Sequence, residues 1–362
     1  MIIIPFSAHR TIHNILEQAR IKEAFPLHKQ ISEENVRLLG RCRMAEDGIV
    51  FNWTGSGILF RFYGTAAAIM LEHSEPNLAE WIPFLSVRVD GGEVRRVGVG
   101  NSALLPLCMD LPCGEHVVSV TKSSETGTYP LKIKFLQISA GEQQEAKLLP
   151  PPELPLRRIE FVGDSITCGF GNLGTAEQTS FLTAEEDGGQ SYAGLAAAHF
   201  NADSRMICFS GRGIVHNCDG TTDSLIPQFY EKVLANEPDK WDFSKWQPDV
   251  VVINAGTNDD GGGYTSGDEM REGAAQFLKR VRECNPNAHI LWCYGLMTTR
   301  LEPVIQEAVA LAAETDDKIH YLALTPIALA QGEVGTCGHP NVRAHRRAAA
   351  ALIQKISEIT GW

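Results

Sequence analysis

The chain has 362 residues, which is enough for two ordinary domains. Hydrophobic residues make up 44% of it and charged residues 21%, a balance typical of a globular protein with a core of ordinary size. The net charge of -12 argues against a nucleic-acid partner, because binding phosphates requires a basic surface. We expect no membrane partner either, since no apolar stretch approaches the ~20 residues that a membrane span requires.

The N-terminus and the cysteines indicate in which cellular compartment the protein is expected. Residues Met1 to Pro5 are apolar but lack the basic start of a secretory signal. The nine cysteines are odd in number and include no C-x-x-C pair, which fits a reducing compartment better than a disulfide framework. We therefore expect a cytoplasmic protein, or a secreted one if the sequence is a truncated form.

The first part of the chain is predicted to contain an arm and then a β-rich domain. Residues 1–40 are typical of a helical arm, with a helix from Thr11 to about Ala24 and a polar linker after it. Further on, apolar and polar residues alternate, as in Leu85–Asp90 and Leu131–Phe135. Such period-two runs, separated by Gly, Pro and Asn, predict an antiparallel β-sandwich over residues 41–150.

The pattern changes after Leu148–Pro152, a proline-rich stretch that we interpret as a linker. Over residues 151–362, short apolar runs alternate with helical patterns, which predicts an α/β domain whose parallel sheet is covered by helices on both faces. Ser266 begins the clearest helix with a capping box, and a final helix is expected from about Val342 to Ile359. The predicted strands are Ile159–Val162, Met206–Phe209, Val250–Ile253 and Ile290–Trp292.

Ser165 is the candidate nucleophile. It follows the first strand of the α/β domain, and the working site of such sheets lies beyond the carboxyl ends of the strands. Gly-Asp-Ser is also a common turn tripeptide, and a serine hydroxyl needs a base to take its proton. The candidate base is His339, which precedes the final helix with Pro340 fixing the turn. His345, on that helix, is a weaker candidate.

Four segments together resemble the SGNH (GDSL-like) hydrolase superfamily. They occur in the family's order and follow the strands that should precede them, over roughly residues 156–362. The resemblance singles out His339 among the eleven histidines and implies a three-layer, flavodoxin-like SGNH hydrolase domain. The segments are Gly163–Ser165, Ser210–Gly213, Gly256–Asp259 and His339–Pro340.

More specifically, the chain resembles family 2 of the carbohydrate esterases, which are acetyl xylan or oligosaccharide acetylesterases with a jelly-roll β-sandwich before the hydrolase domain. Trp53–Phe62 is similar to the opening hairpin of that sandwich, and Ser210–Asn217 to the family's second block. With these, the resemblance extends over most of residues 40–362. It implies removal of O-acetyl groups from oligosaccharides through an acyl-enzyme, and a carbohydrate-binding role for the sandwich.

The same resemblance implies a catalytic dyad of Ser165 and His339. It assigns the oxyanion hole to the backbone N–H groups of Ser165 and Gly211 and to the side-chain amide of Asn258. Donors aimed at a developing oxyanion are often the largest catalytic term, and glycine lets the backbone approach the substrate closely. Asparagine after a buried strand is also a common turn residue.

The acid member of a triad is missing from its usual place. Many SGNH hydrolases carry an aspartate three residues before the histidine, and here that position is Thr336. Some members of the esterase family lack this aspartate and use a main-chain carbonyl. Residues Gly335 to Gly338 could present one to His339, since a glycine-rich turn constrains the backbone little.

Other motifs are interpreted more simply. Gly169–Gly174 matches G-x-G-x-x-G, but a polar loop, about residues 175–190, follows it instead of a helix, so we interpret it as a flexible active-site loop. Asp259 and Asp260 lack His or Cys ligands at supporting spacing, so no metal and no cofactor is expected. Asn217 and Tyr264 are the candidate substrate-binding residues, with Tyr264 a platform for a sugar.

Two alternatives remain open. One is a lipase-like esterase or thioesterase that acts on longer acyl chains. The other, of a different class, is a carbohydrate-binding protein with an inactive hydrolase domain, although inactivation should remove Ser165, Asn258 or His339 and all three are present. The expected partner is an acetylated carbohydrate substrate, and the sequence leaves a homo-oligomer open.

Overall fold

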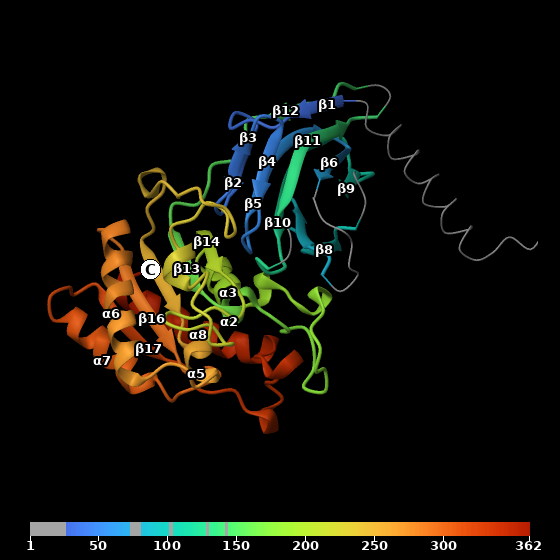
Figure 1. The fold of residues 1–362 in the computed structure, drawn as a ribbon. Helices are drawn as coiled ribbons and strands as arrows, with labels where there is room; N and C mark the ends of the chain where they lie inside the picture. Colours follow the sequence, from blue (N-terminus) through green and yellow to red (C-terminus); the bar gives the residue numbers. More distant parts are fainter. Residues whose placement is uncertain (1–26, 73–80, 101–103, 128–129, 142–143) are drawn as a thin grey trace, which may run out of the picture.

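The computed structural model describes residues 27–72, 81–100, 104–127, 130–141 and 144–362. It has two parts, a β-sandwich formed by the first half of the chain and an α/β domain formed by the second (Figure 1). The helix expected from Thr11 to about Ala24 lies outside the described residues.

The sandwich consists of two antiparallel sheets packed face to face. Its strands are β1 (Leu27–Gln30), β2 (Val36–Leu39), β3 (Arg43–Ala45), β4 (Gly48–Phe51), β5 (Gly57–Gly64), β6 (Ala66–Glu72), β7 (Phe84–Val89), β8 (Arg95–Gly98), β9 (Leu104–Cys108), β10 (Gly114–Lys122), β11 (Leu131–Ser139) and β12 (Lys147–Leu149). One sheet has the order β3-β4-β11-β6-β9 and the other β12-β5-β10-β7-β8. Burial alternates along β5 and β10, whose inward side chains join Phe51 and Leu136 in one core.

Residues 27–40 differ from the linker expected there, because they carry β1 and β2. β1 pairs with β11 at Phe135–Ile138, beyond the residues of β11 that pair with β4. β2 pairs with β5 at Gly57–Phe60, beyond the residues that pair with β12. Each of these edge strands has only four residues, which is too short for a period-two pattern to stand out from a polar linker.

The α/β domain is built on a five-stranded parallel sheet. Its strands are β13 (Arg158–Gly163), β14 (Asp203–Cys208), β15 (Val250–Asn254), β16 (His289–Tyr294) and β17 (Ile319–Ala323). Their order, β14-β13-β15-β16-β17, is the 2-1-3-4-5 order of flavodoxin-like sheets. The fold class predicted from the sequence, an α/β domain preceded by an antiparallel β-sandwich, is confirmed.

Helices cover both faces of this sheet. They are α2 (Ser165–Cys168), α3 (Tyr192–His199), α4 (Ile226–Phe229), α5 (Thr257–Gly261), α6 (Gly267–Cys284), α7 (Glu302–Ala313) and α8 (Val342–Thr360), with short 3-10 turns at Thr183–Glu185, Gly188–Gln190, Phe243–Lys245, Leu329–Gln331 and Thr336–Gly338. α6 and α7 pack on the face that carries Val251 and Ile253, and α3 and α8 on the face that carries Val252. Ser266 caps α6 through the predicted capping box. No helix among the described residues is long and apolar enough to cross a membrane.

A buried polar contact joins the two parts. Arg41, which follows β2, is fully buried, and its guanidinium lies 2.9 Å from the Glu160 carboxylate on β13. It also donates to the carbonyls of Tyr230 and Lys232. The indole N–H of Trp53 donates to the Val233 carbonyl at 2.7 Å. Residues of the sandwich therefore complete the core and the hydrogen bonding of the α/β domain.

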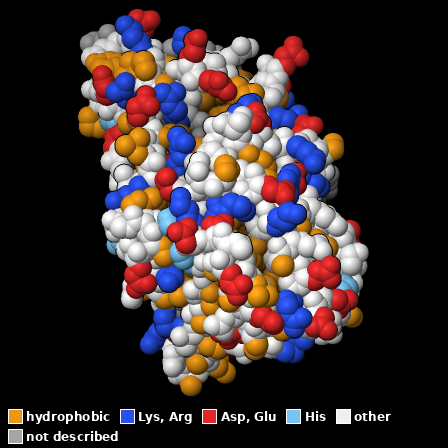
Figure 2. Space-filling view, turned by 90° about the vertical axis from the view of Figure 1, so that its left-hand side faces the viewer, with side chains coloured by type: hydrophobic (Ala, Val, Ile, Leu, Met, Phe, Trp, Pro, Cys, Tyr) orange, Lys and Arg blue, Asp and Glu red, His pale blue; other side chains and the backbone are white. Residues whose placement is uncertain are grey.

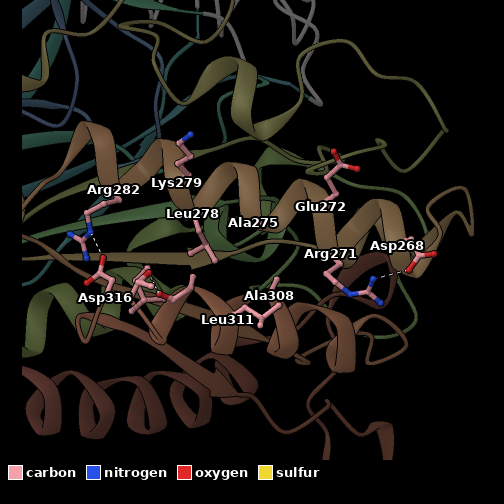
Figure 3. Close-up of a pocket in the computed structure, with 13 residues that line it drawn as sticks. Asp268, Arg271, Glu272, Ala275, Leu278, Lys279, Arg282, Ala308, Leu311 and Asp316 are labelled. Carbon is pink, nitrogen blue, oxygen red and sulfur yellow. Dashed lines mark hydrogen bonds and ion pairs between the residues drawn. The ribbon is translucent and has the colours of Figure 1, made fainter.

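The outer surface carries mixed charge and a groove between two helices. On the face shown in Figure 2, basic and acidic side chains are interspersed rather than gathered by sign. A groove of about 660 Å³ lies between α6 and α7 (Figure 3). Four of its charged groups pair with each other, Arg271 with Asp268 at 2.8 Å and Arg282 with Asp316 at 2.6 Å. The groove lies over one face of the sheet and therefore apart from the sheet edge that carries Ser165.

Candidate active site

Ser165 lies at the carboxyl end of β13, as the first residue of α2. Asp164 caps this short helix by accepting a hydrogen bond from the Ile166 N–H at 3.0 Å. Gly169 ends it with a φ of 84°, in the left-handed region that favours glycine. N–H groups in the first turn of a helix have no partner within the helix. Both the hydroxyl and the N–H of Ser165 can therefore face a substrate at this edge.

The structure brings His339 to Ser165 across 174 residues of sequence. The Nε2 atom of His339 lies 2.9 Å from the Ser165 hydroxyl oxygen. Its Nδ1 atom lies 3.3 Å from the carbonyl oxygen of Cys337. Because a carbonyl only accepts, the ring proton belongs on Nδ1, which leaves Nε2 as the acceptor for the serine proton. The pair thus has the arrangement of a nucleophile and its base.

Burial sets the charge state of this histidine. Phe170 packs against the ring, with centroids 4.5 Å apart. Burial lowers the pKa of His339 to about 4, and hydrogen bonding to the carbonyls of Cys337 and Thr336 offsets this only in part. The imidazole is therefore neutral at pH 7, as a general base must be.

Thr336 does not contact the imidazole through its side chain. Its hydroxyl instead donates to the Glu185 carboxylate at 2.8 Å, in the loop of residues 170–190. The group that meets His339 Nδ1 is the main-chain carbonyl of Cys337, whose φ of 53° is unusual for a residue other than glycine. We call residues 335–339 the histidine turn.

Gly211 and Asn258 follow the two strands that flank β13. Gly211 comes after β14 with a φ of 78°, a conformation that few other residues adopt. Asn258 is in α5, directly after β15, and its amide nitrogen lies 2.9 Å from the Arg212 carbonyl and 3.3 Å from the Asp164 carboxylate. The amide therefore lies between the segment that carries Gly211 and the segment that carries Ser165.

Asp259 and Asp260 are both engaged in hydrogen bonds. The Asp259 carboxylate accepts from the consecutive N–H groups of Ile214, Val215 and His216, at 2.7 to 3.0 Å. Asp260 pairs with Arg300 at 2.6 Å. These carboxylates shape the loops around the site.

Asn217, a candidate substrate-binding residue, lies in the loop that follows Gly211. Its side chain is buried and bonds within its own loop, accepting from the Gly213 N–H at 3.2 Å and donating to the Asp223 carbonyl at 2.8 Å. It supports the segment around Gly211 instead of presenting polar atoms to a substrate. Tyr264 is 55% exposed and its ring lies against Gly220 and Gly262, so it borders the same loop.

A row of aromatic rings leads from the sandwich to the histidine. Trp81 is 37% exposed and lies 5.6 Å from Phe181 between ring centroids. Phe181 stacks on Phe170 at 3.8 Å, and Phe170 contacts His339. Sequence reasoning missed these three residues, because they come together only when the loop of residues 170–190 packs against the sandwich.

One buried group of acidic and thiol side chains lies close enough together to suit a metal. Ligand atoms of Glu125, Cys168 and Glu186 are within 4.8 Å of one another. However, the buried Lys122 ammonium donates to the carbonyls of Asn52 and Glu125, and so supplies positive charge at this place. Burial raises the pKa values of both glutamates, which favours their neutral forms. The cluster fits a buried, hydrogen-bonded contact between the two parts better than a metal site.

His345 lies in the core and away from the dyad's hydrogen bonds. It is fully buried on α8, and its Nδ1 atom accepts from the Tyr192 N–H at 3.1 Å. Burial lowers the pKa of His345 to about 3. It therefore acts as a neutral core residue.

The G-x-G-x-x-G match has a structural explanation. A Cβ atom on Gly171 or Gly174 would collide with Thr336, at 2.8 and 1.8 Å from its side chain. These glycines let the loop of residues 170–190 approach the histidine turn closely. Glu185 and Gln178 of that loop were also missed from the sequence, because a polar loop gives no signal that two of its half-buried side chains lie near a distant turn.

Family models match both parts of the chain. The model described as GDSL-like lipase/acylhydrolase family matches residues 161–347. The chain belongs to this family. The model described as carbohydrate esterase 2 N-terminal matches residues 38–152. The resemblance to SGNH hydrolases and to carbohydrate esterase family 2, inferred from motifs, is confirmed.

Curated relatives and solved structures agree with this GDSL-like assignment. The cellulase/esterase CelE of Acetivibrio thermocellus is 32% identical over 86% of this chain, and the chain spans 38% of that relative's length. An acetylxylan esterase / glucomannan deacetylase of Cellvibrio japonicus is 25% identical over 91% of this chain and 90% of its own length.

Among solved structures, a family two carbohydrate esterase from Clostridium thermocellum in complex with cellohexaose is 29% identical, with a TM-score of 0.83, over 90% of this chain and 99% of that one. A family 2 enzyme of Corynascus thermopiles is 26% identical, with a TM-score of 0.77, over 90% of this chain and 100% of that one. The shared fold therefore extends over both the sandwich and the α/β domain.

Proposed function

We propose that this chain is a carboxylic ester hydrolase that removes O-acetyl groups from xylan-derived or other oligosaccharides. The observation that carries the proposal is the 2.9 Å contact between the Ser165 hydroxyl and His339 Nε2. A neutral imidazole at this distance accepts the hydroxyl proton as the serine oxygen attacks the acetyl carbonyl carbon. The protonated imidazole then gives its proton to the departing sugar oxygen, which leaves an acetyl group on Ser165.

Water completes the cycle in the proposed mechanism. His339 takes a proton from a water molecule, which attacks the acetyl-serine, and the imidazolium returns this proton to the Ser165 oxygen as acetate leaves. Each attack places negative charge on the former carbonyl oxygen. The proposed donors for that oxyanion are the N–H groups of Ser165 and Gly211 and the amide of Asn258, which exchanges its 3.3 Å contact with Asp164 for the oxyanion. The Cys337 carbonyl holds the imidazole tautomer, so the base works as a dyad without an aspartate.

The carbohydrate part of the proposal is supported by the relatives and by the aromatic row. The curated relatives include enzymes named for acetylxylan and glucomannan, and one similar structure contains cellohexaose. In this chain, Trp81, Phe181 and Phe170 form a line of rings that ends at His339. Sugar rings present apolar C–H faces to such surfaces, whereas a long acyl chain would need a deep apolar pocket.

Acyl-chain preference tests the proposal. We expect 4-nitrophenyl acetate to be hydrolysed at least about tenfold faster than the octanoate ester, because a site shaped for acetyl excludes the added methylenes. Acetate release should also be seen with acetylated xylan oligosaccharides. A preference for octanoate would favour the lipase-like alternative. Binding of the oligosaccharides without release of acetate would favour a carbohydrate-binding protein.

A further inference from the structure

The histidine turn is held by the loop of residues 170–190, and the β-sandwich holds that loop. We infer that Glu185 and Arg96 are positioning residues for His339, so that the sandwich is a structural part of the catalytic machinery. This inference rests on the proposed esterase function. It concerns the placement of the base and is independent of which acetylated sugar is the substrate.

The first step is the contact between the loop and the histidine turn. Both oxygens of the Glu185 carboxylate accept hydrogen bonds, one from the Thr336 hydroxyl at 2.8 Å and one from the Gln178 side-chain amide. The Gln178 carbonyl in turn accepts from the Cys337 N–H at 2.8 Å. These contacts hold the Thr336 side chain and the N–H of Cys337, the residue whose carbonyl meets His339 Nδ1. Glu185 therefore places a carboxylate next to Thr336, the position at which many SGNH hydrolases carry their aspartate.

The second step is the contact between the sandwich and the loop. The Arg96 guanidinium, on β8, donates to the carbonyls of Thr183, Ala184 and Glu186, with distances of 3.4 Å and 3.2 Å to the first two. The Thr183 hydroxyl donates back to the Ile82 carbonyl of the sandwich at 2.8 Å. One arginine thus holds the backbone on both sides of Glu185.

The two neighbouring glutamates connect these steps. Glu185 faces the histidine turn, whereas the Glu186 carboxylate accepts from the Glu125 N–H of the sandwich at 2.7 Å. A shift of the sandwich relative to the loop would therefore move the carboxylate that anchors Thr336. Because a misplacement of about 1 Å can cost about a hundredfold in rate, even a partial release of the turn should be measurable.

The first experiment replaces Glu185 by glutamine. Glu185→Gln keeps the size but turns one acceptor into a donor, which then faces the donor of Thr336 or Gln178. We expect kcat on 4-nitrophenyl acetate to fall about tenfold with KM within about twofold, because the substrate contacts remain and the base is misplaced. The rate of inactivation by phenylmethylsulfonyl fluoride, which modifies Ser165 with the help of the base and without a sugar, should fall in parallel. The matched control is Glu177→Gln, which removes an exposed charge from the same loop.

The second experiment tests the sandwich. Arg96→Gln should lower kcat in the same way, whereas Arg95→Gln, which removes donors to the sandwich's own Pro106 and Leu107 carbonyls, should not. The double variant Arg96→Gln/Glu185→Gln should lose less activity than the product of the two single fold-losses, because both substitutions act on one chain of contacts. Arg96→Lys keeps the charge with fewer donors, and gives a milder variant to assay if Arg96→Gln does not fold.

The outcomes separate this inference from the proposed function. If the wild-type protein neither hydrolyses the acetate nor reacts with the sulfonyl fluoride, the proposed function is wrong and the inference falls with it. If the wild-type protein is active and Glu185→Gln matches Glu177→Gln, the function stands and the positioning role is wrong. A change in KM alone, or full additivity of the two variants, would also overturn it.

Discussion

The two sides of the candidate site are built in different ways. The serine side, which carries Ser165, Gly211 and Asn258, follows the ends of three adjacent parallel strands, so the sheet itself brings it together. The histidine side is a turn before α8 that a loop holds through two backbone hydrogen bonds and through side-chain contacts. The serine side is therefore positioned by the sheet, which is rigid. The histidine side depends in part on side-chain contacts that single substitutions can remove.

The largest expected effect is on the serine side. Ser165→Ala removes the nucleophile and should lower kcat by about 10⁴-fold or more while the melting temperature stays unchanged. Steady-state kinetics with 4-nitrophenyl acetate measure this, and Ser244→Ala, an exposed serine in a distant turn, is the control. Near-wild-type turnover in Ser165→Ala would end the serine-esterase proposal. Loss of wild-type activity in the presence of a chelator would instead argue for a metal.

The next effect concerns the oxyanion donor on the same side. Asn258→Ala should reduce kcat on the order of 10²–10³-fold with little change in KM, because the donor acts mainly on charge that develops in the transition state. Asn287→Ala, in the exposed turn before β16, is the matched control. A loss smaller than about threefold would make Asn258 a turn residue that only bridges Asp164 and Arg212.

The histidine side should respond more weakly to loss of the Thr336 hydroxyl. Thr336→Val keeps the shape and both backbone hydrogen bonds of the turn, to Gly171 and Gln178, but loses the donor to Glu185. We expect kcat to fall by less than about tenfold, under ~1.4 kcal/mol. Thr336→Ser, which keeps the hydroxyl, should stay close to wild type. A collapse as large as that of Ser165→Ala would show that the hydroxyl is essential and that the carbonyl-supported dyad is wrong.

The smallest effect is a shift of the acid limb of the pH profile. The active imidazole is neutral, and burial lowers the pKa of His339 to about 4, so activity should fall only as the pH drops toward 4. At pH 5.5 the protein should keep nearly all of its plateau kcat/KM, about 97%, whereas a pKa of 6.5 would leave about one-tenth. An acid limb near pH 7 would point instead to Asp164, which contacts Asn258 and whose pKa burial raises to about 7.

The same contrast explains what the sequence could predict. Strands β13 to β16 are buried on both faces and therefore appear as apolar runs, and the residues that follow them carry recognisable motifs. The helices α6 and α8 carry amphipathic patterns and clear N-caps. β17 is an edge strand with mostly half-buried residues, so its pattern is weak. Glu185 and Arg96 act through contacts with residues far along the chain, about which local spacing carries no information.

The buried ion pair of Arg41 and Glu160 determines whether the α/β domain can be expressed without the sandwich. The family pattern suggests two modules that could be exchanged or expressed apart. A fragment of residues 151–362 would keep Glu160 in the core but lose Arg41, which forms an ion pair with it and donates to the Tyr230 carbonyl. Removing one partner of a buried ion pair costs about 3–5 kcal/mol, a large share of the stability of an ordinary domain. For protein engineering, the chain is therefore one unit, and grafts of new carbohydrate specificity belong in its loops rather than at the boundary between its parts.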